Sequence, residues 1–197
     1  MIYSKMMKKH NNLFIPDILI TDRNVKPVVT FVYCTILELM FYSYMKEIPP
    51  KVLKDYCLIG KQSRLENILN QLKDLDLISF SKNFTHSNHF TYRFEIKKSK
   101  KFTIIPKSKL NKIQKYCDAP EKSLRIYLIY ARYHNNMFGY SFPTYKQIRE
   151  CVTIRDDDIC AINAELEYIG LIRIQQDFSS AGQKFKNNRY RLVDYPL

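Results

Sequence analysis

The chain has 197 residues, and its 32 lysines and arginines outnumber 19 acidic residues, which gives a net charge of +13. Such an excess attracts polyanions, nucleic acid before an acidic membrane surface, although a merely soluble basic protein can also carry it. Five cysteines without CxxC or Cys/His ligand spacing argue against a disulfide framework and a zinc site, and four glycines without a phosphate loop argue against a nucleotide site. We therefore expect no metal, no cofactor, no membrane contact and a cytoplasmic protein.

The first predicted elements are a short strand that ends in Ile15-Pro16 and a long helix over about 27–44. The helix covers a nearly apolar run that contains Glu38 and is short for a bilayer span. A buried central helix therefore explains the run better than a membrane segment. Pro27 suits the first turn of such a helix.

Two further helices are expected over about 51–56 and 62–75. In the second of these, leucine and isoleucine recur at steps of three and four, which is the spacing of one buried helix face. A hairpin follows, because aromatic residues in 90–96 alternate with polar ones and so predict one buried and one exposed face. The segment 97–103 is a short basic linker that leaves little freedom on either side of it.

The same order then recurs, because 48–80 aligns with 142–174 at a constant offset of 94. The offset is 90 where "FIP" matches "IIP" near the start of each copy, and 98 where "YRF" matches "YRL" near the end. Shifts confined to loops are typical of two copies of one module. The second copy is therefore expected to contain helices over about 123–134, 145–151 and 156–169 and a closing hairpin.

Gly170 follows the last of these helices and indicates its end. Asp76 holds the equivalent position in the first copy, where it is tolerable if its backbone becomes left-handed.

A strand, three helices and a two-stranded hairpin in each copy predict an α+β, mainly α, fold of two winged helix-turn-helix modules in tandem, 1–99 and 100–197. Together with the Ile-Pro strand, a proline before each second helix and the L-x-x-L-x-x-L-I pattern that ends the first copy, this order resembles tandem winged-helix proteins of Gram-positive plasmids and other mobile elements. These include TraN-type conjugation repressors and the N-terminal regions of replication initiators. The resemblance covers nearly the whole chain and implies an internal pseudo-dimer whose partner is double-stranded DNA.

In such a module the third helix can lie in the major groove, where arginine pairs with guanine and glutamine or asparagine with adenine. The polar face of the first third helix supplies both kinds of side chain, although a solvated helix face has a similar composition. Ser63 could alternatively cap the helix. The candidates for base contacts are Gln62, Arg64 and Asn67, and those for phosphate contacts are Lys61, Ser63 and Lys73.

The third helix of the second copy begins with the acidic run 156–158, which suits a helix N-terminus but repels phosphate. Thr153 and Asp156 form a T-x-x-D capping pattern. Three interpretations remain open: the helix contacts cytosines while Arg155 and the hairpin hold phosphates, the module touches DNA through its hairpin alone, or it serves another contact. The candidates are Arg155 and Asn163 for bases and Thr144 for the backbone.

The hairpin tips are the clearest candidates for phosphate contacts, with exposed charged loops as the alternative. Asn187-Asn188 suits a tight turn in the second hairpin. The candidates are Lys82, His86, His89 and Arg93 in the first hairpin and Lys184, Lys186, Arg189 and Arg191 in the second.

No constellation of catalytic residues is visible, so we expect no enzyme. The predicted function is sequence-specific binding of double-stranded DNA by a monomeric pseudo-dimer, a transcriptional repressor of a plasmid or mobile element that occupies a promoter or transfer origin. The alternative is a replication-initiation or relaxosome accessory protein that binds origin repeats and contacts replication or relaxosome proteins. A protein–protein adaptor is the third hypothesis.

Overall fold

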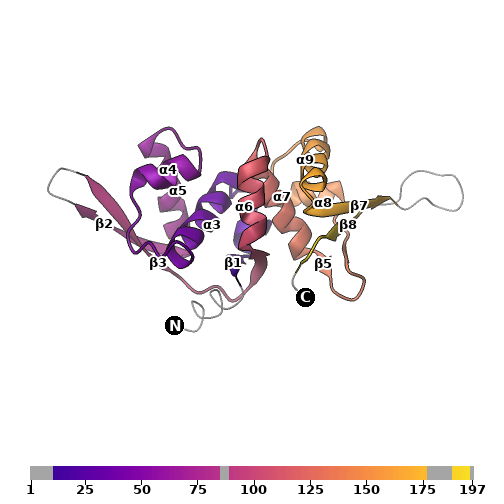
Figure 1. Ribbon diagram of the computed structural model, residues 1–197, viewed down its shortest axis with the longest axis horizontal. Helices are drawn as coiled ribbons and strands as arrows, with labels where there is room; N and C mark the ends of the chain where they lie inside the picture. Colours follow the sequence, from indigo (N-terminus) through magenta and orange to yellow (C-terminus); the bar gives the residue numbers. More distant parts are fainter. Residues whose placement is uncertain (1–10, 85–88, 177–187, 196–197) are drawn as a thin grey trace, which may run out of the picture.

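The computed structural model describes residues 11–84, 89–176 and 188–195. Helices dominate an α+β architecture whose small sheets are antiparallel. Figure 1 shows an elongated molecule with a β-hairpin at each end, helix pairs on the upper side of both lobes and further helices between them. In the described part of the chain, no helix is both long enough and apolar enough to cross a membrane.

The two halves of the chain contribute the same order of elements, except that the second half adds the short strands β5 and β6. The first half consists of β1 (Asn12–Pro16), α2 (Ile18–Thr21), α3 (Pro27–Phe41), α4 (Pro50–Tyr56), α5 (Gln62–Asp74), β2 (Ile78–Phe84) and β3 (Phe90–Ile96). The second half consists of β4 (Phe102–Pro106), α6 (Lys107–Tyr116), α7 (Pro120–Arg132), β5 (His134–Asn135), β6 (Tyr140–Ser141), α8 (Tyr145–Cys151), α9 (Asp156–Tyr168), β7 (Ile172–Gln176) and β8 (Asn188–Leu192).

The bounds of these elements confirm the internal repeat. Helices α5 and α9 begin and end at positions that differ by 94, and strands β1 and β4 do so at positions that differ by 90. The predicted left-handed position is also confirmed, because φ is 53° at Asp76 and 69° at Gly170. A left-handed residue that ends a helix lets the chain turn at once into the following strand.

Strands β1 and β4 pair with each other and thereby join the two halves. Asn12 lies opposite Pro106, Pro16 lies opposite Phe102, and Phe14 faces Ile104 at the centre of the ribbon. Since each of the outer pairs is the repeat equivalent of the other, the register defines a pseudo-twofold axis at its midpoint. Helices α3 and α7, which are equivalent in the two halves, also pack against each other.

The buried side chains form one continuous cluster that extends through both halves. Tyr33 and Tyr127, equivalent residues of α3 and α7, are 1% and 0% exposed within it. The boundary predicted between residues 99 and 100 therefore separates two repeated segments but not two independent cores. The prediction that the apolar run is a buried central helix is confirmed by α3.

Helices α2 and α6 and the β5–β6 hairpin were not predicted. In α6 the apolar side chains Leu110 and Ile113 are buried among polar and charged residues. The helix has ten residues, so it contains little more than one repeat of the apolar pattern, and a pattern that short does not distinguish a helix from a loop.

The predicted T-x-x-D cap is wrong. Arg155 occupies the N-cap position of α9, and the Asp156 carboxylate instead lies 2.7 Å from the Arg149 guanidinium. A capping box does occur one helix earlier, at Thr144 and Gln147 before α8.

Two ion pairs join the halves at positions related by the pseudo-twofold axis. Oδ2 of Asp17, which follows β1, lies 2.8 Å from Nε of Arg132 at the end of α7. Its counterpart joins Lys107, which follows β4, to Glu38 of α3 at 3.7 Å. The signs are reversed between the two pairs, because the first half supplies both acids and the second half supplies both bases.

Arg125 of α7 is a buried cation that also connects the halves. It is 0% exposed and donates hydrogen bonds to the Thr30 hydroxyl (2.7 Å) and to the backbone oxygens of Asp22 (2.8 Å) and Cys151 (2.9 Å). Burial lowers the pKa of Arg125 to about 10, which still leaves it charged at neutral pH. The guanidinium therefore ties the end of α8 to the first half of the chain.

Candidate nucleic-acid interface

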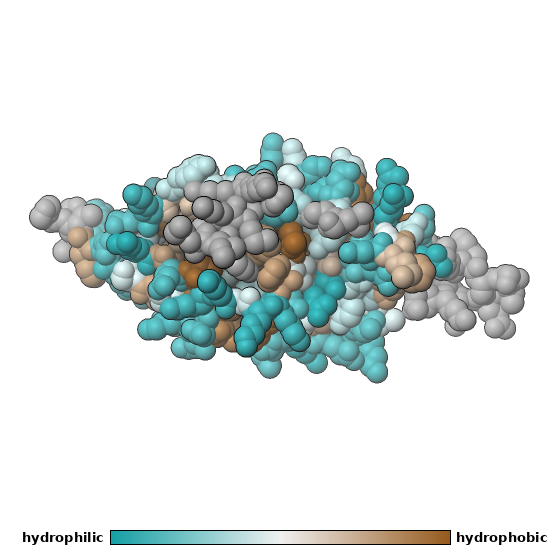
Figure 2. Space-filling view, turned by 90° about the horizontal axis from the view of Figure 1, so that it is seen from below, coloured by the Kyte–Doolittle hydropathy of each residue, from teal (hydrophilic) through white to brown (hydrophobic). Residues whose placement is uncertain are grey.

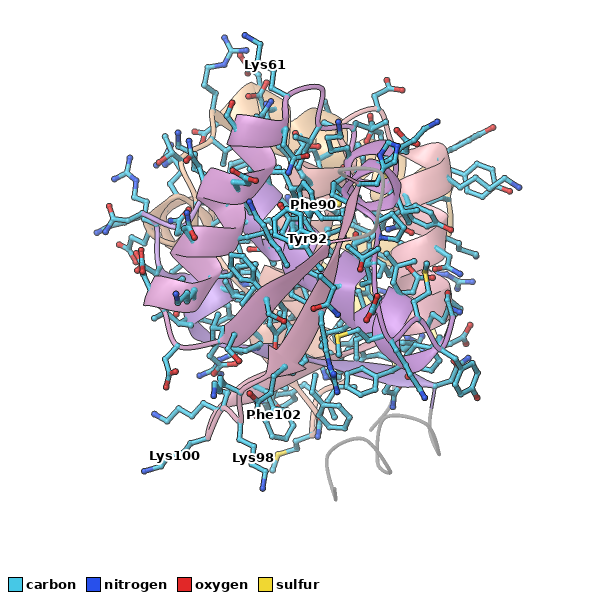
Figure 3. All side chains as sticks on the ribbon, turned by 90° about the vertical axis from the view of Figure 1, so that its left-hand side faces the viewer. Lys61, Phe90, Tyr92, Lys98, Lys100 and Phe102 are labelled. Carbon is cyan, nitrogen blue, oxygen red and sulfur yellow. The ribbon has the colours of Figure 1, made fainter. Side chains whose placement is uncertain are left out.

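The first turns of α5 present four of the predicted DNA contacts to solvent. Lys61, the N-cap residue, lies at the upper end of the molecule in Figure 3. On the helix that follows Lys61, three further residues are exposed: Ser63, Arg64 and Asn67. Arg64 and Asn67 are three residues apart and so share a face, and among the described residues neither side chain has a hydrogen-bond or ion-pair partner. No side chain caps α5, which makes the capping alternative for Ser63 wrong.

Gln62, unlike Arg64 and Asn67, forms hydrogen bonds within the protein. It is half-buried, and its Nε2 donates to the Tyr92 hydroxyl at 2.8 Å and to Oε1 of Glu66 at 3.3 Å. The same Glu66 oxygen accepts a 2.7 Å hydrogen bond from Nζ of Lys82. These bonds fasten the β2–β3 hairpin to α5, and those from Lys82 and Gln62 lower the pKa of Glu66. The Gln62 amide is thus committed within the protein, contrary to its predicted role at a base.

The remaining predicted contacts of the first half are spread over the hairpin and the far end of α5. Arg93 and His89 are exposed on or beside β3. Lys73 is exposed in the last turn of α5, about 18 Å along the helix from Lys61 at 1.5 Å per residue. His86 lies outside the described residues. Lys82 is engaged by Glu66 and by the ring of Phe90, whose centroid lies 4.9 Å from Nζ.

The start of α9 is acidic, and two of its carboxylates pair with arginines of the same half. Arg155 is exposed, with Nη2 3.2 Å from Oδ1 of Asp158, and hydrogen bonding from Arg155 lowers the pKa of that carboxyl. Nη1 of Arg149 donates hydrogen bonds to both carboxylate oxygens of Asp156, each at 2.7 Å. These arginines neutralise part of the acidic run, and Arg155 remains accessible to a phosphate.

Two predicted contacts of the second half are structural residues. Asn163 is 3% exposed, and its Oδ1 accepts a 2.6 Å hydrogen bond from the buried Tyr130 hydroxyl, so it cannot contact a base. The repeat could have indicated that Asn163 is buried, because the equivalent residue in the first half is the core residue Leu69. The Thr144 hydroxyl accepts from the backbone N–H of Gln147 and caps α8, so it serves this helix rather than a DNA backbone.

The described part of the β7–β8 hairpin contains two of the predicted cations. Arg191 is exposed on β8, and the Arg189 guanidinium carbon lies 6.0 Å from the centroid of the Phe142 ring. Lys184 and Lys186 lie outside the described residues. Asn188 is the first residue of β8, where the sequence had predicted part of a turn.

The exposed faces of α5 and α9 therefore differ in chemistry. At the offset of 94, Asp158 replaces Arg64, and Ala161 replaces Asn67. Cys160 replaces Glu66, so the second half also lacks the acid that holds the first hairpin to its helix. The role of Glu66 was not predicted, although its four-residue spacing from Gln62 is a visible signal of a helical pair.

Comparison of the chain with protein-family models, with curated proteins and with solved structures finds no match in any of the three.

Proposed function

We propose that the chain is a tandem winged-helix protein that binds double-stranded DNA in a sequence-specific manner. In each half, α4 and α5 or α8 and α9 form the helix-turn-helix, and β2–β3 or β7–β8 forms the wing. The observation that carries the proposal is the pair Arg64 and Asn67, two exposed and unengaged side chains on one face at the start of α5. A net charge of +13 supports a polyanionic partner.

Base recognition belongs to the first half in this proposal. With α5 in the major groove, the Arg64 guanidinium can donate to O6 and N7 of a guanine, and the Asn67 amide can pair with an adenine. Lys61 and Ser63 precede them on the same turn and contact the flanking phosphates.

The second half holds the DNA backbone. The α9 face offers Asp158 and Ala161 in place of the donors of α5, and Asn163 is buried. Of the three interpretations of this module, the proposal keeps the phosphate contacts of the first, by Arg155 and by the wing residues Arg191, Lys184 and Lys186, and drops its contacts to cytosine.

Repression by occupancy is the simplest action of such a chain. Two modules that follow successive turns of the duplex would cover a promoter or transfer origin of a mobile element and exclude polymerase or relaxase.

Selection of bound fragments from random duplexes tests the proposal. We expect one enriched motif with a guanine and an adenine close together, and an affinity for it that falls with salt at a log–log slope of about −0.9 for each phosphate contact. Fragments without an enriched motif, or an absence of duplex binding at low salt, would refute it. The genomic position of the motif separates a promoter from a set of origin repeats.

A further inference from the structure

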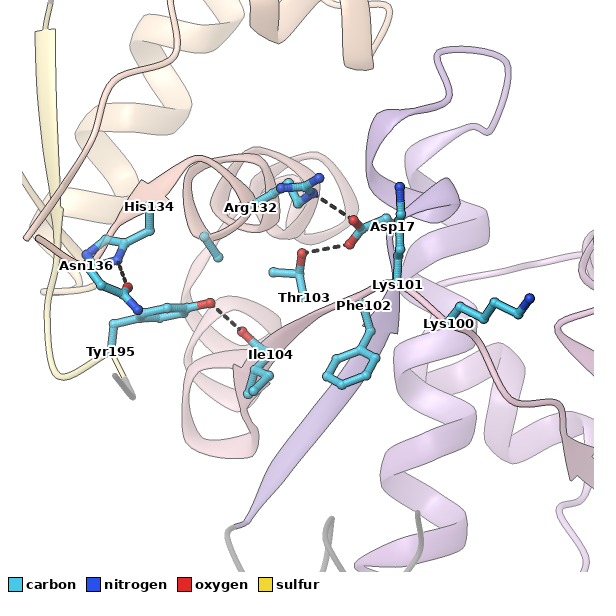
Figure 4. Close-up of a pocket in the computed structure, with 11 residues that line it drawn as sticks. Asp17, Lys100, Lys101, Phe102, Thr103, Ile104, Arg132, His134, Asn136 and Tyr195 are labelled. Carbon is cyan, nitrogen blue, oxygen red and sulfur yellow. Dashed lines mark hydrogen bonds and ion pairs between the residues drawn. The ribbon is translucent and has the colours of Figure 1, made fainter. Parts of the chain in front are cut away.

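We infer that a cleft at the junction of the two halves binds a small organic phosphate. The cleft has a volume of about 490 Å³, within the range of small-molecule sites. Its walls come from the end of β1, the linker before β4, the end of α7, the β5 strand and the C-terminal segment (Figure 4). The lining of this junction cleft includes Asp17, Lys100, Lys101, Arg132, His134 and Tyr195.

The charges of the junction cleft favour an anion. Lys100, Lys101 and Arg132 line the junction cleft together with a single carboxylate, that of Asp17, and the Lys100 side chain extends away from Asp17 (Figure 4). That carboxylate is already bound by Nε of Arg132 at 2.8 Å and by the Thr103 hydroxyl at 3.1 Å. Within the described residues neither lysine has an ion-pair partner. The surplus of two positive charges matches a phosphate monoester, which carries about two negative charges at neutral pH.

The opposite wall of the junction cleft is aromatic and fixed in place. The rings of His134 and Tyr195 have centroids 5.1 Å apart. A 3.0 Å hydrogen bond joins Nδ1 of His134 to Oδ1 of Asn136, and the Tyr195 hydroxyl donates to the backbone oxygen of Ile104 at 3.1 Å. Rings held by such bonds can pack against a planar group, so the ligand combines a phosphate with a flat ring, as a nucleoside monophosphate does.

The junction cleft lies away from the proposed DNA-binding side. Figure 3 places Lys100 and Phe102 at the lower end of the molecule and Lys61 at the upper end. The described residues that are visible on the lower face are largely hydrophilic, with apolar patches between them (Figure 2). The ligand is therefore a separate molecule and not a phosphate of the same duplex.

Calorimetric titration of the full chain with adenosine 5′-monophosphate tests the site. We expect one binding event that weakens at least tenfold in the variant Lys100→Ala/Lys101→Ala. The control Lys46→Ala/Lys51→Ala removes the same charge from exposed positions outside the cleft and should bind like the unaltered chain. The same loss in both variants, or no binding to the unaltered chain, would overturn the proposal.

Two further measurements test the kind of ligand and its source. Tyr195→Ala should weaken the binding of the nucleotide but not that of inorganic phosphate, and equal affinity of both ligands for the unaltered chain would refute the aromatic half of the site. Saturating duplex should leave nucleotide binding intact, and its abolition would place the cleft in a DNA interface. Because the titration itself needs no DNA, failure of the cleft and failure of the proposed function give separate results.

Discussion

Asp17 and Arg132 join the two halves of the chain through a 2.8 Å ion pair between side chains that are 16% and 44% exposed. We expect Asp17→Lys to lower the free energy of unfolding by about 1–3 kcal/mol, since two cations would meet and Thr103 would lose its acceptor. Adding Arg132→Glu should restore part of the loss, which urea denaturation can measure. Strictly additive losses would contradict a direct interaction.

Arg125 should be far more costly to replace than an exposed arginine. Arg125→Leu leaves the Thr30 hydroxyl and the Cys151 backbone oxygen without this donor in a buried site and removes one of the two donors to the Asp22 backbone oxygen, so we expect a loss of about 3–5 kcal/mol. Arg149→Leu, which removes an exposed ion pair, is the control and should cost about 1 kcal/mol or less. Similar unfolding free energies for the two variants would show that the buried bonds contribute nothing.

Arg64 and Arg155 should affect DNA binding in different ways if the proposed function holds. Arg64→Ala should cost about 1–3 kcal/mol on the selected site and relax the preference at one base pair. Arg155→Ala should weaken all duplexes alike and flatten the salt dependence by about one phosphate contact. Anisotropy titrations on the selected and on a scrambled duplex measure both effects. A uniform loss for Arg64→Ala would reassign it to phosphate.

Glu38 should make stability depend on pH. Burial raises the pKa of its carboxyl above the ordinary value of 4.5, although Lys107 partly opposes the shift. The folded state therefore binds the proton more tightly than the unfolded chain, and the unfolding free energy of the native protein falls as pH rises from 4.5 through the folded pKa. Glu38→Gln should lack this fall. We expect the difference in melting temperature, variant minus native, to grow between pH 4 and pH 8; a constant difference would contradict the shift.

The elements with a long and regular apolar pattern could be predicted from the sequence. Helix α5 begins at the predicted Gln62 and ends one residue before the predicted Leu75. Helix α9 agrees as closely, because both helices bury one face against the same kind of core. What escaped prediction was pairing between segments far apart in the chain, above all β1 with β4, since periodicity carries no information about which strand is the partner.

The residue types of the candidate site could be predicted from the sequence. Which of these side chains are bound to partners within the protein could not. Composition identified Gln62, Lys82 and Asn163 as polar and available, and the structure commits all of them to partners within the protein. A buried asparagine and an exposed one look alike in a sequence, because the difference depends on what packs against them. The repeat could have indicated that Asn163 and Arg125 are buried, since their equivalents, Leu69 and Phe31, are apolar core residues.

The reversed signs of the two ion pairs between the halves have a consequence for whether a dimer of identical half-length chains could replace the joined chain. A half-length polypeptide made from the first repeat alone would bring Asp17 of one copy against Glu38 of another, and one made from the second would oppose Lys107 and Arg132. Either homodimer would carry like charges on both sides of its axis, whereas the covalently joined halves carry complementary ones. The charges at these four positions therefore favour pairing of the first segment with the second over pairing of either segment with a copy of itself.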